Sequence, residues 1–230
     1  MRKNERRGRE RSAGHGHVVS GEHPRRGMRS ELAQRVARAA ALLGDGGLVA
    51  YPTETFYGLG ALYSRTDALA RLASAKLRPG DKPLPLIAAD WEQVERVAWL
   101  DPRVRRVAER FWPGALTLVL PAQGDLDSLL TANTGTVAIR IPGSPIARAL
   151  AQQAGGPLVS TSANLSGDPP VTAASDISPT LLSRIDGILD GGPTPGGLPS
   201  TIVSLEQGGL RLIRAGSVLF AEVEAVACAG

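Results

Sequence analysis

Cysteine and histidine are nearly absent from this 230-residue chain. Its single cysteine is Cys228, and all three histidines lie within the first 23 residues. A chain with one cysteine forms no internal disulfide, so we expect a protein of the reducing cytoplasm. Residues 30–230 contain no histidine, which excludes Ser-His-Asp and Cys-His catalytic centres and His/Cys zinc sites from that part of the chain.

Two common nucleotide-binding loops are also missing. The sequence contains neither GxxxxGKS/T nor GxGxxG. No apolar run reaches the roughly 18 residues that a membrane span needs, and the N-terminus has no apolar core of a secretory signal. We therefore expect no membrane association, and any nucleotide site must be built from other elements.

Positive charge is concentrated at the N-terminus. Residues 1–29 hold nine Lys and Arg against three Glu, a net charge of +6, which leaves −2 for residues 30–230. With almost no apolar side chains to bury, residues 1–29 have the composition of a disordered Arg-rich tail. The tail is either an RNA-binding arm or a solvated extension without a role, and Met28 could be the true start. We expect residues 30–230 to form one domain.

Short apolar runs alternate with segments of helical periodicity in residues 30–230. The pattern predicts helices at 30–43, 68–77, 91–99, 102–111, 144–155 and 218–226, and strands at 48–51, 84–89, 115–120, 137–141, 158–161, 201–205 and 210–214. The order is not strictly βαβ. We therefore expect an α/β fold, with a twisted open mixed β-sheet covered by helices.

A cationic loop follows the second expected helix. Lys76, Arg78 and Lys82 lie within seven positions, and the nearby prolines and glycine prevent the helix from continuing. Guanidinium groups form forked bonds to phosphate oxygens, and ammonium groups act as point charges. The cluster therefore suits a polyanion such as a triphosphate. Taken alone, a short basic loop is more typical of a solvated turn.

Hydroxyl groups and a buried charge mark three further stretches. Residues 51–60 carry two threonines and a carboxylate after a strand, with glycines that permit close backbone approach. Residues 160–167 follow another strand, at an end where open α/β sheets bind ligands. Either stretch could be only a polar turn. In 136–142, Arg140 interrupts an apolar strand, where a charge is costly unless it is partnered. We expect a bound anion or a buried carboxylate beside Arg140.

Together, the motifs resemble the short, single-domain form of the YrdC-like threonylcarbamoyl-AMP synthases. They are Tyr51-Pro52-Thr53-Glu54-Thr55, Tyr57-Gly58-Leu59-Gly60, Lys76-x-Arg78-Pro79, Pro113-Gly114-Ala115-Leu116-Thr117, Val137 to Pro142, Ser160-Thr161-Ser162-Ala163-Asn164, Pro199 to Val203 and Arg214-Ala215-Gly216. The resemblance covers about residues 31–220. It implies a YrdC-like catalytic domain with a concave ligand cavity in residues 30–230.

The resemblance also implies a function. Such an enzyme is an L-threonylcarbamoyladenylate synthase, a nucleotidyltransferase that condenses L-threonine, bicarbonate and ATP into threonylcarbamoyl-AMP and pyrophosphate. Its product serves the threonylcarbamoyladenosine modification next to the tRNA anticodon. We expect Mg²⁺ to accompany ATP, and a downstream threonylcarbamoyl transferase complex to take the labile product. Direct tRNA contact is a further possible interaction.

The resemblance assigns roles residue by residue. Lys76 and Arg78 are the implied catalytic side chains, and no protein ligand to a metal is implied. The implied ATP-binding residues are Arg78, Lys82, Thr136, Ser162, Asn164, Pro170 and Arg214, and the implied threonine-binding residues are Thr55, Arg140, Ser160 and Ser200. A histidine that often follows the Lys-x-Arg loop in relatives is replaced here by Leu86, Ile87 and Ala88.

The chemistry agrees with these residue types, although two other readings stay open. Attack of a carbamate oxygen on the α-phosphate depends mainly on positioning and on cations where charge gathers. It therefore needs no histidine. The alternatives are a diverged YrdC-like paralogue without synthase activity and an RNA-binding module that uses the Arg-rich tail.

Overall fold

The computed structural model describes residues 24–76, 83–206 and 209–228. In this part of the chain the helices are α1 (Pro24–Gly44), α2 (Thr66–Ala75), α3 (Trp91–Glu95), α4 (Pro102–Phe111), α5 (Ser128–Thr131), α6 (Pro145–Gln153), the 3₁₀ helix η1 (Ala174–Asp176), α7 (Pro179–Leu182) and α8 (Phe220–Cys228). The strands are β1 (Val49–Pro52), β2 (Tyr57–Gly60), β3 (Leu86–Ile87), β4 (Leu116–Pro121), β5 (Thr136–Arg140), β6 (Leu158–Val159), β7 (Thr161–Ser162), β8 (Gly187–Ile188), β9 (Thr201–Glu206) and β10 (Gly209–Arg214).

Strands β1 and β2 form an antiparallel hairpin at the centre of a four-stranded sheet. The order is β7-β2-β1-β8, with β8 parallel to β1 and β7 antiparallel to β2. The Tyr51 ring lies against Gly60, where an added Cβ would stand 2.6 Å from the ring. Only glycine leaves room for the ring at this position, so Gly60 permits the Tyr51 hydroxyl to reach the carbonyl of Val159, 3.0 Å away.

A second, six-stranded sheet has the order β10-β9-β4-β5-β3-β6. Strand β5 pairs antiparallel with β4 and parallel with β3, and β9 lies parallel to β4. Strand β3 is only two residues long, shorter than the predicted 84–89. Pro83 and Pro85 precede it, and proline has no N–H to donate to a ladder. The prolines therefore keep the strand from extending toward its N-terminus.

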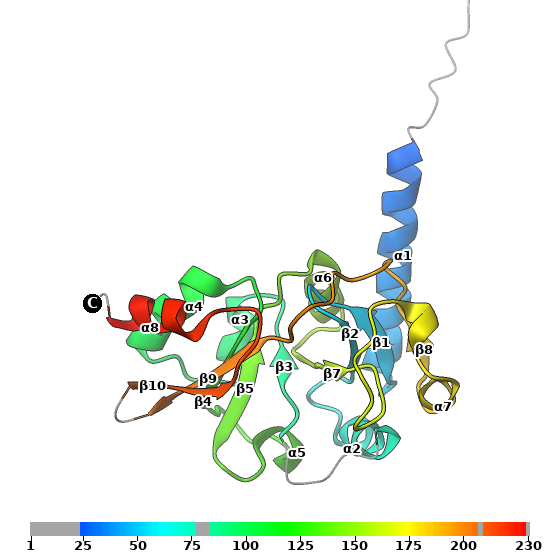
Figure 1. Ribbon diagram of the computed structural model, residues 1–230. Helices are drawn as coiled ribbons and strands as arrows, with labels where there is room; N and C mark the ends of the chain where they lie inside the picture. The colour runs from blue at the N-terminus through cyan, green and yellow to red at the C-terminus, as the bar shows by residue number, and fades with distance from the viewer. Residues whose placement is uncertain (1–23, 77–82, 207–208, 229–230) are drawn as a thin grey trace, which may run out of the picture.

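The chain passes from one sheet to the other at Ser160. The N–H of Ser160 donates to the carbonyl of Pro85, 2.8 Å away, in the six-stranded half. The next two residues, Thr161 and Ser162, already pair with Leu59 and Gly58 of β2. Figure 1 shows the two sheets in opposite halves of the molecule, with β3 and β7 nearest the junction. Ser160 is therefore placed where the two halves meet.

Helices cover both halves and bury the apolar strands. Helices α1 and α6 pack together over a core cluster that includes Val49 of β1, Ile87 of β3 and Leu158 of β6. Because this cluster takes side chains from both sheets, it holds the two halves together. Helices α4 and α8 pack against each other at the six-stranded end (Figure 1). None of the helices in the described ranges combines the length and hydropathy of a membrane span.

The predicted α/β class with open mixed sheets covered by helices is confirmed. The strands are divided between two sheets, whereas the sequence pattern predicted one. Helix α1 begins at Pro24, six residues before the predicted start of the domain, and residues 1–23 lie outside the described residues. The alternation of strands and helices along the sequence indicates the fold class. The passage of the chain from one sheet to the other at a single residue, Ser160, leaves no mark in the hydrophobic pattern.

Candidate active site

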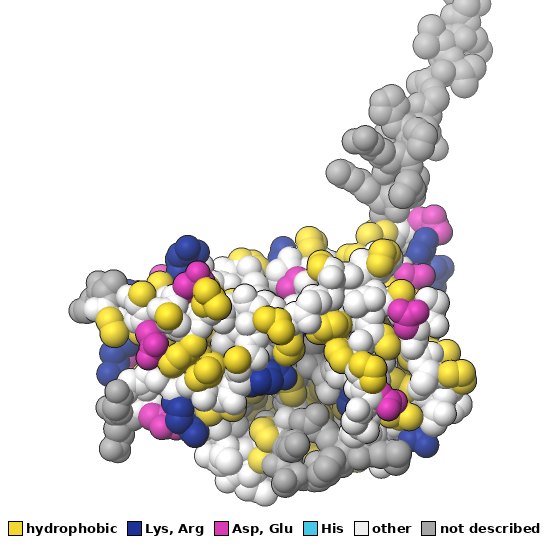
Figure 2. Space-filling view, viewed as in Figure 1, with side chains coloured by type: hydrophobic (Ala, Val, Ile, Leu, Met, Phe, Trp, Pro, Cys, Tyr) yellow, Lys and Arg dark blue, Asp and Glu magenta, His cyan; other side chains and the backbone are white. Residues whose placement is uncertain are grey.

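The predicted site residues gather largely where the two sheets meet. They come from the turn after β1, the end of β5, the crossing from β6 to β7, and the segments that begin β9 and end β10. Figure 2 shows a hollow in the middle of one face of the molecule, with Lys or Arg side chains beside it. Hydroxyls and cations from both halves therefore approach a common region.

A hydrogen-bonded turn presents Glu54 and Thr55 after β1. The Thr53 hydroxyl accepts from the N–H groups of Thr55 and Phe56, at 3.2 and 3.3 Å, and donates to the carbonyl of Phe56 at 2.7 Å. Short hydroxyl side chains stabilise turns in this way. The Thr55 hydroxyl lies 3.2 Å from that of Thr53 and is largely buried. The turn thus holds a hydroxyl and a carboxylate beside the second sheet.

Arg140, at the end of β5, is paired with Glu54 across the two sheets. Its Nε donates to Glu54 Oε1 at 3.2 Å, with side chains only 6% and 17% exposed. The other Glu54 oxygen accepts from the N–H of Ser144 at 3.3 Å. A pair buried this deeply needs such further hydrogen bonds to offset its desolvation. Of the two partners expected for Arg140, the structure supplies the buried carboxylate.

Lys76 ties the end of α2 to the turn after β7. The residue is 3% exposed, and its ammonium donates to the carbonyls of Ser162 and Asn164, the latter at 2.7 Å. The Asn164 amide nitrogen donates in turn to the carbonyls of Leu165 and Asp168. Within the described residues Asn164 Oδ1 is buried without a hydrogen-bond partner. Because such an orphan acceptor is costly, it is suited to accept from a ligand.

Arg214 and Ser200 form a second cluster in the six-stranded half. Arg214 donates to the Ser200 carbonyl at 2.7 and 3.2 Å and to its hydroxyl at 3.0 Å. The hydroxyl also lies 2.9 Å from that of Thr117 on β4. An added Cβ on Gly216 would stand 2.2 Å from the carbonyl oxygen of Pro199. The close approach at Gly216 therefore lets the segment after β10 lie against the segment before β9.

Two guanidinium groups from different strands act on each other in this region. Arg214 as a whole residue is exposed, whereas its hydrogen bonds to Ser200 are partly buried. Burial lowers the pKa of the Arg214 guanidinium, and the positive charge of Arg140 lowers it further. Like charges that repel each other are stabilised by an anion bound near both. The electrostatics therefore favour a carboxylate or phosphate ligand.

Two predicted ATP-binding residues, Thr136 and Pro170, take no part in the hydrogen bonds described above. Thr136 begins β5, four residues before Arg140, which places it roughly 13 Å away along the strand. Its hydroxyl lies 2.7 Å from that of Thr134. Pro170 is exposed, next to Val171, whose carbonyl accepts from the N–H of Tyr57. Only an extended ligand could contact both Thr136 and Arg140. The predicted residues Arg78 and Lys82 lie outside the described residues.

The sequence analysis assigned no role to two residues that the structure places in the candidate site. Glu54 and Thr117 both lie inside motifs that carry the resemblance, but neither was assigned a contact. Glu54 holds Arg140, and Thr117, which is 1% exposed, lies beside the Ser200 hydroxyl. The available signal was the charge of Glu54 within a turn that otherwise carries hydroxyls. Its partner could not be read from the sequence, because Arg140 follows 86 positions later.

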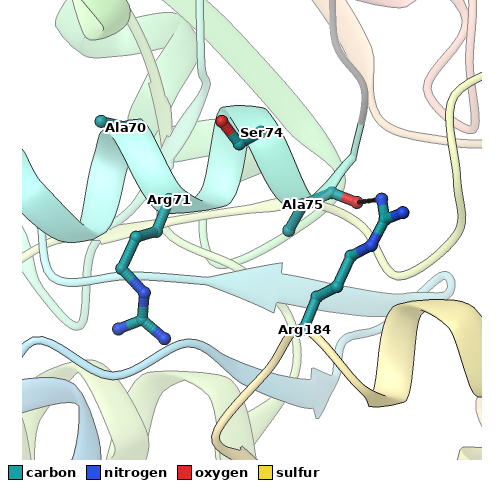
Figure 3. Close-up of a pocket in the computed structure, with 5 residues that line it drawn as sticks. All are labelled: Ala70, Arg71, Ser74, Ala75 and Arg184. Atoms are coloured by element: carbon teal, nitrogen blue, oxygen red, sulfur yellow. Dashed lines mark hydrogen bonds between the residues drawn. The ribbon is translucent and has the colours of Figure 1, made fainter.

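A separate hollow of about 490 Å³ lies along α2, lined by Ala70, Arg71, Ser74, Ala75 and Arg184. Figure 3 shows Arg184 reaching up to the carbonyl of Ala75, at 2.9 Å, at the end of the helix. Arg71 donates instead to Asp186 at 2.8 and 3.1 Å and to the carbonyl of Gly46. Both arginines therefore serve the protein's own oxygens, and none of the five lining residues belongs to the predicted site.

Known proteins share the sequence and the fold. The chain is 45% identical over 194 residues to the threonylcarbamoyl-AMP synthase of Bacillus subtilis, covering 84% of this chain and 56% of that protein. The structure is similar to that of P. abyssi Sua5 complexed with L-threonine, with a TM-score of 0.80 and 39% identity over 84% of this chain and 57% of that one. It is also similar to E. coli YciO, with a TM-score of 0.73 and 26% identity over 80% and 90% of the two chains.

These matches cover most of this chain but a smaller share of two of the relatives. This chain spans a little over half the length of the B. subtilis and P. abyssi proteins. The family model named for Sua5, YciO and YrdC, described as "Telomere recombination", matches residues 41–216. This range includes the turn after β1, Lys76, Arg140, the crossing at Ser160 and Arg214. The chain therefore belongs to the Sua5/YciO/YrdC family.

Proposed function

We propose that this protein is a threonylcarbamoyl-AMP synthase, which condenses L-threonine, bicarbonate and ATP into threonylcarbamoyl-AMP, pyrophosphate and water. The observation that carries the proposal is the convergence of Arg140 and Arg214 on a region rich in buried hydroxyls. Two cations there suit a substrate pair with a carboxylate and a triphosphate. The names of the B. subtilis and P. abyssi relatives support the same substrates.

At the amino-acid end, Arg140 holds the carboxylate of threonine. Its Nε is taken by Glu54, so its terminal nitrogens remain for a carboxylate, which suits a guanidinium fork. Thr55, Ser160 and Ser200 are each at most 9% exposed and supply hydroxyls around it. A buried polar pocket discriminates a hydroxyl-bearing side chain from an apolar one of similar size, because unpaired polar groups are costly. Threonine is therefore preferred over valine.

At the nucleotide end, Arg214, Ser162 and Asn164 contact ATP. The orphan Oδ1 of Asn164 accepts from the ligand, and Arg214 supplies charge beside Ser200. Thr136 and the backbone at Pro170 extend the site away from the arginines, as a nucleotide requires. Arg78 and Lys82, which lie outside the described residues, complete the phosphate contacts. Lys76 holds the backbone of the turn that carries Ser162 and Asn164.

The reaction proceeds by positioning rather than by protein acid or base. The amine of threonine takes up bicarbonate with loss of water to give a carbamate, and a carbamate oxygen attacks the α-phosphorus of ATP. The bond to the β-phosphate oxygen breaks, and pyrophosphate leaves with its electron pair. Fixed cations stabilise the charge that gathers there. Mg²⁺ would accompany ATP and would offset the charge of its phosphates. The Glu54 carboxylate is already paired with Arg140.

The product has to leave for a second enzyme. Threonylcarbamoyl-AMP is a labile mixed anhydride, so we propose a downstream threonylcarbamoyl transferase complex as partner, in the cytoplasm, where tRNA is modified. Direct contact with tRNA belongs to the same proposal, and its test is the tail deletion described below.

Pyrophosphate release from ATP by the purified chain tests the function. The measurement is made with Mg²⁺, with and without L-threonine and bicarbonate, and with valine or serine in place of threonine. We expect release that requires both co-substrates and falls strongly with either substitute. Release that ignores threonine, or no release, would overturn the proposal in favour of a diverged paralogue or an RNA-binding module.

A further inference from the structure

Glu54 connects the two halves of the molecule at the site. It lies in the turn between β1 and β2 of the four-stranded sheet, and its carboxylate reaches β5 of the six-stranded sheet and the start of α6. We propose that Glu54 is a positioning residue, which sets the orientation of Arg140 so that its terminal nitrogens grip the carboxylate of the amino-acid substrate. This inference rests on the proposed function.

The contact between Glu54 and Arg140 fixes more than a distance. A guanidinium group is planar, with its five N–H donors in a rigid fork. When Nε donates to Glu54 Oε1 at 3.2 Å, the edge of the guanidinium that carries Nε faces Glu54, and the end edge formed by the two terminal nitrogens is directed elsewhere. Within the described residues, those terminal nitrogens donate no hydrogen bond to the protein. The geometry therefore leaves one edge of the guanidinium for a ligand.

The support behind Glu54 is itself rigid. Its second oxygen accepts from the N–H of Ser144, whose hydroxyl donates to the carbonyl of Pro52 at 3.2 Å. An added Cβ on Gly143 would lie 3.4 Å from Cβ and Cγ of Glu54, so the backbone of Gly143 packs close to this side chain. The guanidinium of Arg148 donates to the carbonyls of Pro142 and Gly143. The start of α6 thus holds the carboxylate in one place.

These contacts argue against two other roles for Glu54. Both of its oxygens already accept hydrogen bonds, from Arg140 and from Ser144, so the carboxylate is not placed as a proton acceptor for substrate. A purely electrostatic role makes the opposite prediction from a positioning role. Removing the negative charge would leave Arg140 and Arg214 as two uncompensated cations, which would strengthen anion binding, whereas loss of orientation would weaken it.

Two variants separate these roles. Glu54→Gln keeps the length and loses the charge, and Glu54→Asp keeps the charge and shortens the reach. A misplacement of about 1 Å can cost up to roughly 100-fold, so we expect KM for threonine to rise about tenfold or more in both, with KM for ATP within twofold. Glu92→Gln is the matched control, because Glu92 forms an exposed ion pair with Arg96 on α3 and lies outside the site.

The effect must also depend on Arg140. In an Arg140→Lys background, which has no Nε, Glu54→Gln should change KM for threonine by less than twofold. The inference would be overturned if Glu54→Asp had a wild-type KM for threonine, or if Glu54→Gln bound threonine more tightly. It would also be overturned if the KM values for threonine and ATP rose equally, or if the effect of Glu54→Gln were undiminished in the Arg140→Lys background.

A readout without substrate keeps the two proposals apart. The Arg140 Nε–H proton, assigned by its loss in Arg140→Lys, should give a protected signal in ¹⁵N-arginine NMR spectra that moves or vanishes in Glu54→Gln. If the wild type is active but neither the NMR signal nor KM for threonine changes when Glu54 is replaced, only the positioning role is refuted. A wild type without threonine-dependent turnover refutes the proposed function, and the positioning role with it.

Discussion

A buried lysine secures the turn that follows β7. Lys76 is 3% exposed, and its ammonium donates to the carbonyls of Ser162 and Asn164, which lie 86 and 88 positions later in the chain. Hydrogen bonds from a charged donor each contribute about 1.5–3 kcal/mol to stability. We therefore expect Lys76 to affect both stability and activity through the backbone that it holds.

Replacement of Lys76 by methionine tests this contact. Lys76→Met keeps the side-chain length but leaves two buried carbonyls without their donor, so we expect stability to fall by about 3 kcal/mol. In a chain of this size the loss lowers Tm by roughly 6–12 °C. Pyrophosphate release should also fall strongly, because Asn164 and Ser162 shift. Thermal unfolding and the release assay measure the two effects.

Arg96→Met is the control for Lys76→Met. Arg96 forms an exposed ion pair with Glu92 on α3, and exposed pairs contribute at most about 1 kcal/mol. A Tm within 3 °C of wild type is expected for the control. If Tm fell equally in the two variants, the hydrogen bonds of Lys76 would contribute no more to stability than an exposed ion pair.

At the scale of elements, the segment from β10 to α8 is held by close backbone packing. Gly216 lies where an added Cβ would meet the Pro199 oxygen at 2.2 Å and the Ser200 carbon and Thr201 nitrogen at 2.5 Å. All three contacts are to backbone, which cannot move aside as a flexible side chain can. The placement of Arg214 on Ser200 depends on this approach.

We expect Gly216→Ala to separate the two segments. Overpacking typically costs 1–3 kcal/mol, so Tm should fall by roughly 2–12 °C, and KM for ATP should rise as Arg214 leaves Ser200. The matched control is Gly44→Ala at the end of α1, where an added Cβ meets nothing within 4 Å. If Gly216→Ala behaved like this control, the close approach would not be needed for the site.

Whole-molecule charge is divided between the N-terminal residues and the rest of the chain. Residues 1–23 hold six Lys and Arg and three Glu, a net charge of +3 out of +4. The predicted site residues run from Thr55 to Arg214 and include none from that segment. Turnover and RNA binding should therefore respond differently to its removal.

Deletion of residues 1–23 leaves α1 entire, because the helix begins at Pro24. We expect kcat and both KM values to stay within twofold. Any affinity for tRNA should fall and lose much of its salt dependence, because fewer cations release counterions. A second variant, with the six Lys and Arg replaced by Gln, separates charge from length. A tenfold loss of turnover in the deletion would place this segment at the active site.

The α/β class and the family were readable from the sequence, which also predicted the residue types of the candidate site. Apolar periodicity is a local property, and motifs such as 51–60 and 160–167 carry their hydroxyls within a few positions of each other. The absence of histidine from residues 30–230 excluded several chemistries without any coordinates. The single central sheet was the part of the prediction that the pattern could not resolve.

The tertiary structure alone decided which of those residues meet. The crossing at Ser160 divides the strands between two sheets, Glu54 pairs with Arg140 across them, and Arg214 lies on Ser200. Each of these contacts joins residues from different elements of the fold. Their physical reason is long-range packing: the two core clusters each take side chains from both sheets, and this brings together residues that are distant in the sequence.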